Sequence, residues 1–315
     1  MPSVTYSSVL QVRPSTVMFL ARLLQQRREA IGTQSGRRAL SPWSQAVLVL
    51  RRFLDGTRIK QLAADNAIGV STCYRHLHEA VAVLAFAAPD IHEALMAAVA
   101  FGATHVNLDG TLIHTDRLAC TGPNGADLWW SGKHKCHGGN IQVPSPPDGF
   151  PIWVSQVRPE REHDTTCAKA ATDLLPALEA LEAGHRIPTL TDLGYLGPAI
   201  RHPHKKPKGR EPTEDQKAYN AAIRGVHDIG ERTNALLKVT FHALTLVSLS
   251  PTRIGGIVKA TLVPLHLEHD HPLPAVTLHN KHLPGKAHCC SVSLGNTVTR
   301  TKFPRKRNGM HDQEV

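Results

Sequence analysis

The chain has 315 residues, 41% of them hydrophobic, and a formal net charge of +10. This length predicts about two domains, because a domain holds roughly 150 residues, and the composition excludes collagen-like, coiled-coil and largely disordered proteins. No apolar run approaches the ~18 residues of a membrane span, and the N-terminus lacks the basic start and apolar run of a secretory signal. Since six scattered cysteines are too few for a disulfide scaffold, we expect a reduced, cytoplasmic protein without a membrane partner.

The charge is concentrated at the two ends of the chain. Residues 1–90 carry a net charge of +6, residues 91–270 a net charge of −1, and residues 271–315 a net charge of +5. Two basic ends around a near-neutral middle favour a polyanionic partner, most simply nucleic acid. Charge that serves only solubility is the alternative explanation.

The first 90 residues are predicted to be helical. A helix is expected over residues 14–30, and a Gly, Ser and Arg linker after it closes an N-terminal segment of residues 1–40. Ser41-Pro42 then favours a new helix start, because serine caps free N–H groups and proline fits the first turn. Asp55-Gly56 predicts the end of that helix.

Residues 41–90 are expected to form a helix-turn-helix DNA-binding domain. A short helix from Thr57 leads into Ile68-Gly69-Val70, where the glycine would permit a sharp turn, and Ser71 would cap a third helix that reaches about Leu84. The residues expected to face a major groove are Ser71, Thr72, Tyr74, Arg75 and His78, and the predicted DNA contacts among them are Thr72, Tyr74 and Arg75. An ordinary three-helix bundle with Tyr74 in its core is the alternative.

The pattern after Pro89 predicts a helix and then an α/β region. Helices are expected from Ile91 to about Phe101, over residues 164–183 with a kink or split at Pro176, and from about 214 to 247. The predicted strands are residues 105–113, 139–143, 151–157 and 187–192. From about residue 266 to residue 315, scattered histidines, prolines and basic residues predict a flexible basic tail.

Three acidic residues stand out by their position. Asp109 lies inside an apolar strand, where a carboxylate is costly unless it is paired or bound to a metal. Asp192 ends another predicted strand, and Glu231 lies on a helix. Carboxylates from two strands and a helix can converge, and such oxygen ligands suit two Mg²⁺ or Mn²⁺ ions that support phosphoryl transfer. Turn, capping or solvated roles are the alternatives for each acid taken alone.

A series of short motifs runs along the middle of the chain. They are Leu108-Asp109-Gly110-Thr111-Leu112-Ile113, Ser131-Gly132-Lys133-His134-Lys135 with Gly138, Asn140-Ile141-Gln142-Val143, Glu162-His163-Asp164, Thr191-Asp192-Leu193-Gly194-Tyr195, and Gly230-Glu231-Arg232 with Leu237-Lys238. Their order and spacing resemble those of DDE superfamily transposases, with bacterial insertion-sequence-five-like and Harbinger-like elements as the nearest kin. The resemblance covers roughly residues 40–265.

The resemblance implies an RNase H-like endonuclease domain over residues 100–265, in which a mixed five-stranded sheet carries helices on both faces. Residues 198–202 would supply the short fifth strand of that sheet. It assigns the catalytic and metal-binding acids to Asp109, Asp192 and Glu231, which are separated by 82 and 38 residues. Asp164 is a rival for the second acid, although it opens a helix, where capping explains an acid well. The implied cofactor is a pair of Mg²⁺ or Mn²⁺ ions.

The implied activity is that of a bacterial insertion-sequence transposase acting at the nucleoid. It would bind terminal inverted repeats in double-stranded DNA, cut a strand to expose a 3′-hydroxyl, and join that end to target DNA. Joining two ends implies at least a transient homodimer in a synaptic complex. Lys238 lies two turns after Glu231, on the same helix face. The candidate phosphate contacts are Lys133, Lys135, Lys205, Lys206, Lys208, Arg210 and Lys238.

Two other functions remain open from the sequence. A catalytically inactive or domesticated relative of a transposase would bind DNA without cutting it. A metal-dependent phosphohydrolase would act on small phosphoesters, although the basic ends of the chain favour DNA as the partner.

Overall fold

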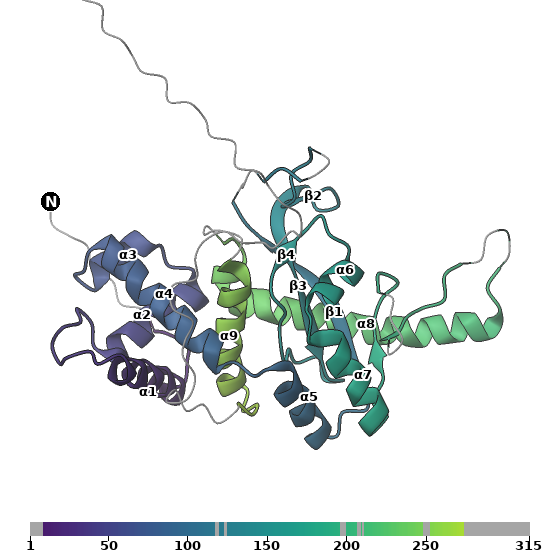
Figure 1. Cartoon of the computed structure of the whole chain (residues 1–315), viewed down its shortest axis with the longest axis horizontal. Helices are drawn as coiled ribbons and strands as arrows, with labels where there is room; N and C mark the ends of the chain where they lie inside the picture. Colours follow the sequence, from purple (N-terminus) through teal and green to yellow (C-terminus); the bar gives the residue numbers. More distant parts are fainter. Residues whose placement is uncertain are drawn as a thin grey trace, which may run out of the picture. The chain divides into compact units, whose positions relative to one another are not determined.

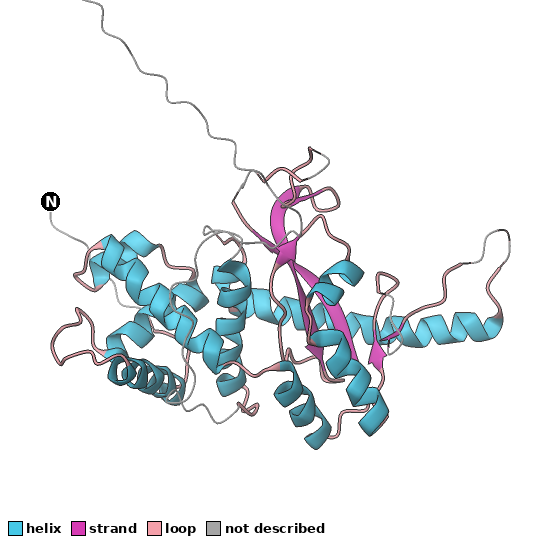
Figure 2. Ribbon diagram, in the orientation of Figure 1, coloured by secondary structure: helices cyan, strands magenta, loops and turns pink. Residues whose placement is uncertain are grey.

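The computed structural model describes residues 9–116, 120–122, 125–195, 200–206, 209, 211–247 and 253–273. Two predicted phosphate contacts, Lys208 and Arg210, lie outside the described residues, as do residues 274–315 of the predicted tail. Within the described part, helices are followed by a mixed sheet with further helices packed on it (Figures 1 and 2). This mixed α/β arrangement is the one predicted from the sequence, and it fits an RNase H-like fold.

Residues 14–100 are helical. The elements are α1 (Pro14–Ala30), α2 (Pro42–Asp55), α3 (Ile59–Asp65), α4 (Val70–Ala87) and α5 (Ile91–Ala100). The predicted start at Ser41 is confirmed, because its Oγ accepts the Ser44 N–H at 3.0 Å. Gly56 ends α2 in the left-handed region, with a φ of 64°. No described helix is by itself long and apolar enough to cross a membrane. Helices α4 and α5 together reach that length and apolar composition, but the chain bends by 53° between them.

The turn between α3 and α4 differs from the prediction. Gly69 has an ordinary φ of −68°, and the residue in the left-handed region is Ala67, with a φ of 51°. α4 begins at Val70, so Ser71 lies inside the first turn and is not the cap. The helix also continues past the predicted end at Leu84, because its last turn is buried in the core.

Helix α9 (Ile254–Glu268) is not predicted by the sequence, because Gly255-Gly256 and Pro264 disfavour a helix. Burial outweighs these local preferences, since every residue from Ala260 to His266 is buried. The helix packs against α4 and α1. The hydrophobic core of the N-terminal helices is therefore completed by a segment from the other end of the described chain.

The sheet has the strand order β2–β3–β1–β5–β6, with β4 also beside β3. The strands are β1 (Val106–His114), β2 (Trp130–Ser131), β3 (Cys136–Ser145), β4 (Arg158–Pro159), β5 (Thr189–Leu190) and β6 (Ile200–Arg201). β1 pairs antiparallel with β3 along its length. It pairs parallel with β5, and β5 pairs parallel with β6. β1 therefore joins an antiparallel half of the sheet to a parallel half.

The predicted strand over residues 151–157 is wrong. This segment runs beside β3, and the Ser155 N–H donates to the Gln142 carbonyl. The Gln142 N–H, however, donates to the side-chain Oγ of Ser155 at 2.9 Å. A strand pair would have a backbone carbonyl as the acceptor at this place, so the segment does not form a strand with β3. Short strands form instead at β4 and β2, and the described sheet has six strands rather than five. The expected fifth strand near residues 198–202 is present as β6.

Helices lie on both faces of the sheet (Figure 1). The predicted helix over residues 164–183 is split into α6 (Asp164–Ala170) and α7 (Leu174–His185), and the break comes before Pro176. The long predicted helix is α8 (Glu214–Thr240), and a short 3₁₀ turn at His242–Leu244 follows it. Along β1, Asp109 faces α8 and Gly110 faces α6. Because successive strand residues point to opposite faces, α6 and α8 cover opposite sides of the sheet.

A buried polar link joins the N-terminal helices. Gln45 of α2 is fully buried, and its Oε1 accepts a hydrogen bond from Arg28 Nη2 of α1 at 2.7 Å. The amide group of Gln45 donates to the His76 carbonyl and to Glu79 Oε2 of α4. Burial lowers the pKa of Arg28, and the hydrogen-bond acceptors of this guanidinium offset part of the cost of burying its charge.

We expect Gln45→Leu to lower the free energy of unfolding by about 2–3 kcal/mol, because a buried charged donor loses an acceptor. Urea denaturation measures this loss. The matched control is Gln25→Leu on the exposed face of α1, which should change the free energy by less than about 0.5 kcal/mol. Equal losses in the two variants would contradict the structural role of Gln45.

Candidate active site

Two acidic residues lie side by side on neighbouring parallel strands. In the register of β1 with β5, Asn107 pairs with Leu190. Continuing this register puts Asp109 opposite Asp192, on chain segments that lie about 4.8 Å apart. Both acids line one small cavity of about 10 Å³, together with Gly230 of α8. The fold therefore brings together two carboxylates that 82 residues separate in the sequence.

Helix α8 faces Asp109 with residues spaced one turn apart. Gly230 permits a close approach, since a Cβ on it would lie 3.5 Å from the Asp109 Cβ. One turn later, Asn234 Nδ2 donates a hydrogen bond to Asp109 Oδ2 at 2.8 Å. Another turn on is Lys238, whose pKa is lowered by burial and raised in part by the charge of Asp109. Glu231 is exposed and shares this face of the helix.

Asp164 lies on the other side of β1. Its carboxylate fills space that two glycines leave open. A Cβ on Gly110 would overlap Asp164 Oδ1, and a Cβ on Gly194 would lie 3.4 Å from Asp164 Oδ2. Asn140 Nδ2 donates a hydrogen bond to Asp164 Oδ1 at 2.7 Å. The two candidates for the second acid thus differ, because Asp192 shares a cavity with Asp109 whereas Asp164 packs on the α6 side of the strand.

The charges of all three aspartates act on the hydroxyl of Tyr195. The side chain is 1% exposed, and its O–H donates to Gln142 Oε1 at 2.5 Å. Burial raises the pKa of Tyr195 well above its usual value, and the charges of Asp164, Asp109 and Asp192 raise it further. The phenol therefore keeps its proton and acts as a donor. Its surroundings also show that the three carboxylates lie within electrostatic reach of one point.

Glu160, which the sequence analysis does not single out, also belongs to this region. It follows β4, and Ser131 Oγ donates a hydrogen bond to its Oε1 at 3.3 Å. Burial, and then the charge of Asp164, raises the pKa of Glu160 to about 7, although Lys133 and Lys238 act in the opposite direction. Its Oε2 is buried without a hydrogen-bond partner among the described residues. A glutamate within a run of charged residues gives no sequence signal for such burial.

Two of the predicted phosphate contacts reach the acids, and others do not. Lys133 and Lys238 lie within electrostatic reach of Glu160. Lys135 is exposed on the turn that joins β2 to β3, and its φ is 55°. The basic residues of this site therefore come from that turn and from α8.

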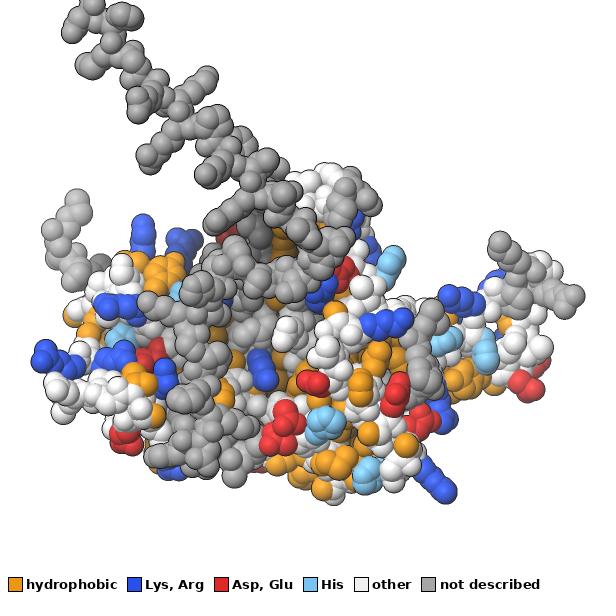
Figure 3. Space-filling model, in the orientation of Figure 1, with side chains coloured by type: hydrophobic (Ala, Val, Ile, Leu, Met, Phe, Trp, Pro, Cys, Tyr) orange, Lys and Arg blue, Asp and Glu red, His pale blue; other side chains and the backbone are white. Residues whose placement is uncertain are grey.

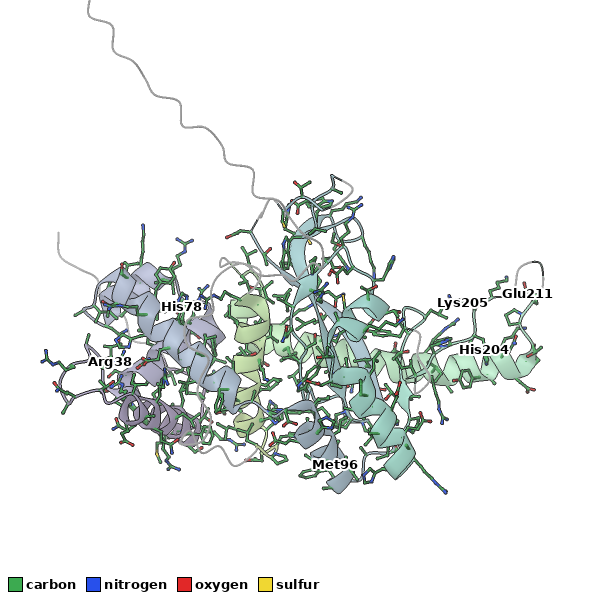
Figure 4. All side chains as sticks on the ribbon, viewed as in Figure 1. Arg38, His78, Met96, His204, Lys205 and Glu211 are labelled. Carbon is green, nitrogen blue, oxygen red and sulfur yellow. The ribbon has the colours of Figure 1, made fainter. Side chains whose placement is uncertain are left out.

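Lys205 and Lys206 lie away from the acids. They are exposed on the connection between β6 and α8, and Figure 4 shows Lys205 and His204 beside the N-terminal half of that helix. The His204 N–H donates to Asn220 Oδ1 at 2.7 Å. Asn220 precedes Asn234 by about 14 residues, or about 21 Å along the helix. These two lysines are therefore separate from the Asp109 cavity.

The predicted DNA contacts on α4 lie on its outer face. Tyr74 and Arg75 are exposed, so Tyr74 is not a core residue, and Arg75 Nη2 donates to Thr72 Oγ1 at 3.0 Å. His78, which was expected to face outward, is instead half-buried, and burial lowers its pKa. It lines a pocket with Ile257 of α9. Figure 3 shows further Lys and Arg side chains spread over this helical region.

The acidic pair has the chemistry of a divalent-metal site. Among the residues that the structure describes, no three His, Cys, Asp or Glu side chains stand close enough together to hold a metal ion. The predicted trio of Asp109, Asp192 and Glu231 is therefore not assembled as a three-ligand cluster. Asp109 and Asp192 nevertheless line the same cavity, and Mg²⁺ commonly binds through one or two carboxylates while it keeps several waters. The two carboxylates supply oxygen ligands of the kind that Mg²⁺ and Mn²⁺ prefer.

Residues 108–266, about half of the chain, match the protein family described as DDE superfamily endonuclease. The chain belongs to this family, as its sequence motifs predicted. Comparison with curated proteins and with solved structures gave no match. Membership in a DDE endonuclease family implies nuclease activity, with DNA as the substrate, and such endonucleases usually use divalent metals.

We expect Glu160 to make the protein less stable as the pH rises. Its pKa of about 7 lies above the ordinary value of 4.5, so between these values the folded chain binds a proton that the unfolded chain releases. Glu160→Gln removes this dependence. The melting temperature of the variant minus that of the wild type should therefore increase from about pH 5 to about pH 8.

The control for this measurement is Glu179→Gln, at an exposed position of α7. Its melting temperature should follow that of the wild type over the same pH range. A constant difference between Glu160→Gln and the wild type at every pH would show that the Glu160 carboxyl does not titrate in this window.

Proposed function

We propose that this protein is a DNA transposase that cuts and joins DNA at the Asp109–Asp192 cavity. The observation that carries the proposal is the meeting of these two acids beneath Gly230 and Asn234 of α8. Membership in the DDE endonuclease family supports a nuclease with DNA as its substrate. The basic residues 1–90, with a net charge of +6, support the same partner.

Each residue near the cavity has a part in the proposed reaction. Asp109 and Asp192 would hold Mg²⁺ or Mn²⁺, with Glu231 as a third carboxylate on the same face of α8. A divalent metal bound there supplies Lewis-acid chemistry, which activates a water or a 3′-hydroxyl and stabilises the leaving oxygen. Asn234 orients Asp109 by donating to its Oδ2. Lys238, whose charge interacts with those of Asp109 and Glu160, would contact a phosphate of the bound strand.

The helical region supplies the proposed recognition of DNA. Helix α4 exposes Tyr74 and Arg75 at its N-terminal end, which is the end that contacts bases when such a helix enters a major groove. Thr72 holds the Arg75 guanidinium by accepting its hydrogen bond. We infer that residues 41–90 act as a helix-turn-helix domain that binds the ends of an insertion sequence. Because two ends are joined in one reaction, two copies of the chain would act together in a synaptic complex.

We expect Asp109→Asn to slow the nicking of inverted-repeat DNA in Mg²⁺ by about 10³-fold or more, because the change removes a charged ligand from the metal. Gel analysis of end-labelled DNA measures the rate. The matched control is Asp215→Asn, at an exposed position in the first turn of α8. It should cut like the wild type.

Other outcomes of the same assay favour other functions. Tight DNA binding without nicking by the wild type favours an inactive or domesticated DNA-binding protein. Hydrolysis of small phosphoesters without affinity for DNA favours a phosphohydrolase. Full activity in Asp109→Asn would falsify the assignment of the active site to this cavity.

We expect Arg75→Ala to weaken binding to the inverted repeats and to reduce the slope of log affinity against log salt by about 1 if the guanidinium contacts a phosphate. If it reads a base edge, preference for the specific sequence should fall by about 1–3 kcal/mol instead. Arg22→Ala, at an exposed position of α1, is the control of equal charge change. The same loss in both variants would indicate general charge attraction and not recognition by α4.

A further inference from the structure

The turn that carries Asp192 is held from the face of the sheet opposite to α8. The Gly194 N–H donates to Asp192 Oδ1 at 2.7 Å, so the turn orients its own acid. The Gly194 carbonyl accepts a hydrogen bond from Thr165 Oγ1 in the first turn of α6. The next residue, Tyr195, donates to Gln142 of β3. The backbone from Asp192 to Tyr195 is thus fixed by two elements that do not carry the acid.

The contact with Gln142 is one link of a longer chain of hydrogen bonds. Tyr195 O–H donates to Gln142 Oε1 at 2.5 Å. Gln142 Nε2 donates to Asn140 Oδ1 at 2.8 Å, and Asn140 Nδ2 donates to Asp164 Oδ1 at 2.7 Å. Asn140 and Gln142 alternate along β3 and so face the same side of the sheet.

The accepting oxygen of Asp164 sets the direction of this chain. A carboxylate only accepts hydrogen bonds, so Asn140 turns its NH₂ group toward Asp164 and its oxygen toward Gln142. The oxygen of Gln142 is then left to face Tyr195, which must donate. Burial and the nearby aspartates raise the pKa of Tyr195, so it keeps the proton that this role requires. In this arrangement each link of the chain pairs one donor with one acceptor.

The glycines next to Asp164 make it a bridge between strands. The carboxylate packs on Gly110 of β1 through Oδ1, and Oδ2 faces Gly194. A Cβ on Gly194 would also lie 2.9 Å from Asp192 Oδ1. Asp164 therefore packs against the backbone beside Asp109 and against the turn that follows Asp192, although it lies on the α6 side of β1.

We propose that Asp164, Asn140, Gln142 and Tyr195 are positioning residues for Asp192. Their hydrogen-bond chain fixes the turn of residues 192–195, and thereby the place of the Asp192 carboxylate beside Asp109, and none of the four touches DNA or metal. This inference rests on the proposed nuclease function of the Asp109–Asp192 cavity. It gives Asp164 a role different from that of a metal-binding acid.

Three variants test the proposal by DNA nicking over a range of Mg²⁺ concentrations. Tyr195→Phe and Asp164→Ala should each lower the nicking rate, or raise the Mg²⁺ concentration for half-maximal activity, by about 10–100-fold. Their affinity for DNA should stay that of the wild type. Asp164→Asn keeps an oxygen that accepts from Asn140, so it should stay within about 10-fold of the wild type. Rescue by this neutral residue separates a positioning role from metal binding, because Asp109→Asn should remain inactive.

The matched control is Tyr219→Phe, which removes a hydroxyl from the ring that packs on His204. It should cut like the wild type. The proposal is overturned if Tyr195→Phe keeps the wild-type rate and Mg²⁺ dependence. It is also overturned if Asp164→Asn is as inactive as Asp109→Asn, since Asp164 would then be a metal ligand.

A stability measurement keeps the inference separate from the nuclease proposal. Urea unfolding of Tyr195→Phe, Asp164→Ala and the double variant forms a cycle in which both changes break one chain of hydrogen bonds. The two effects should therefore be non-additive, and additive effects would overturn the proposal. If the wild type cuts no DNA, the nuclease function fails, while the cycle still decides whether the chain of hydrogen bonds joins Tyr195 to Asp164.

Discussion

The parallel pairing of β1 with β5 is the contact on which the site depends. It comprises only two residue pairs, yet it sets the register that brings Asp109 opposite Asp192. A shift of one residue would turn the side chains of β5 to the other face of the sheet. The long antiparallel pairing of β1 with β3 holds β1 in place, and Tyr195, five residues after β5, connects the segment that follows this strand to β3. The short strand is therefore fixed by its neighbours as well as by its own bonds.

The sheet separates two kinds of chemistry around one strand. On the α8 side, Asp109 meets Gly230 and Asn234 and shares a cavity with Asp192. On the α6 side, Gly110 leaves space for Asp164 and its chain of amide hydrogen bonds. Buried polar groups need hydrogen-bond partners. The hydrogen bonds on the α6 side also hold the turn of residues 192–195, and the acid of that turn, Asp192, shares the cavity on the α8 side. The sheet therefore separates the two sets of polar groups and also fixes the position of the candidate site.

The candidate site lies in the near-neutral middle of the chain, whereas the ends of the chain are basic. Burial raises the pKa of Tyr195 and of Glu160, and the charge of Asp164 raises both further. The positive charges of Lys238 and Lys133 act in the opposite direction on the pKa of Glu160. Such a site favours a cation that neutralises its acids, whereas the basic helices favour a polyanion. The two preferences together suit a nuclease that binds its metal and its DNA through different parts of the chain.

The sequence by itself determined the family and the boundaries of α1, α2 and α5, because caps, hydrophobic periodicity and motif spacing are local. It also singled out Asp109 and Asp192, which the fold brings to one cavity. It did not predict α9, whose glycines and proline disfavour a helix until burial against α4 outweighs them. It also predicted a strand over residues 151–157, where the Ser155 hydroxyl accepts the Gln142 N–H in place of a backbone carbonyl. Only the tertiary structure decided the burial of Glu160, the hydrogen bond from Asn234 and the position of Asp164 behind β1. These depend on which face of a strand meets which helix, and contacts between residues far apart in the chain leave no periodic signal in the sequence.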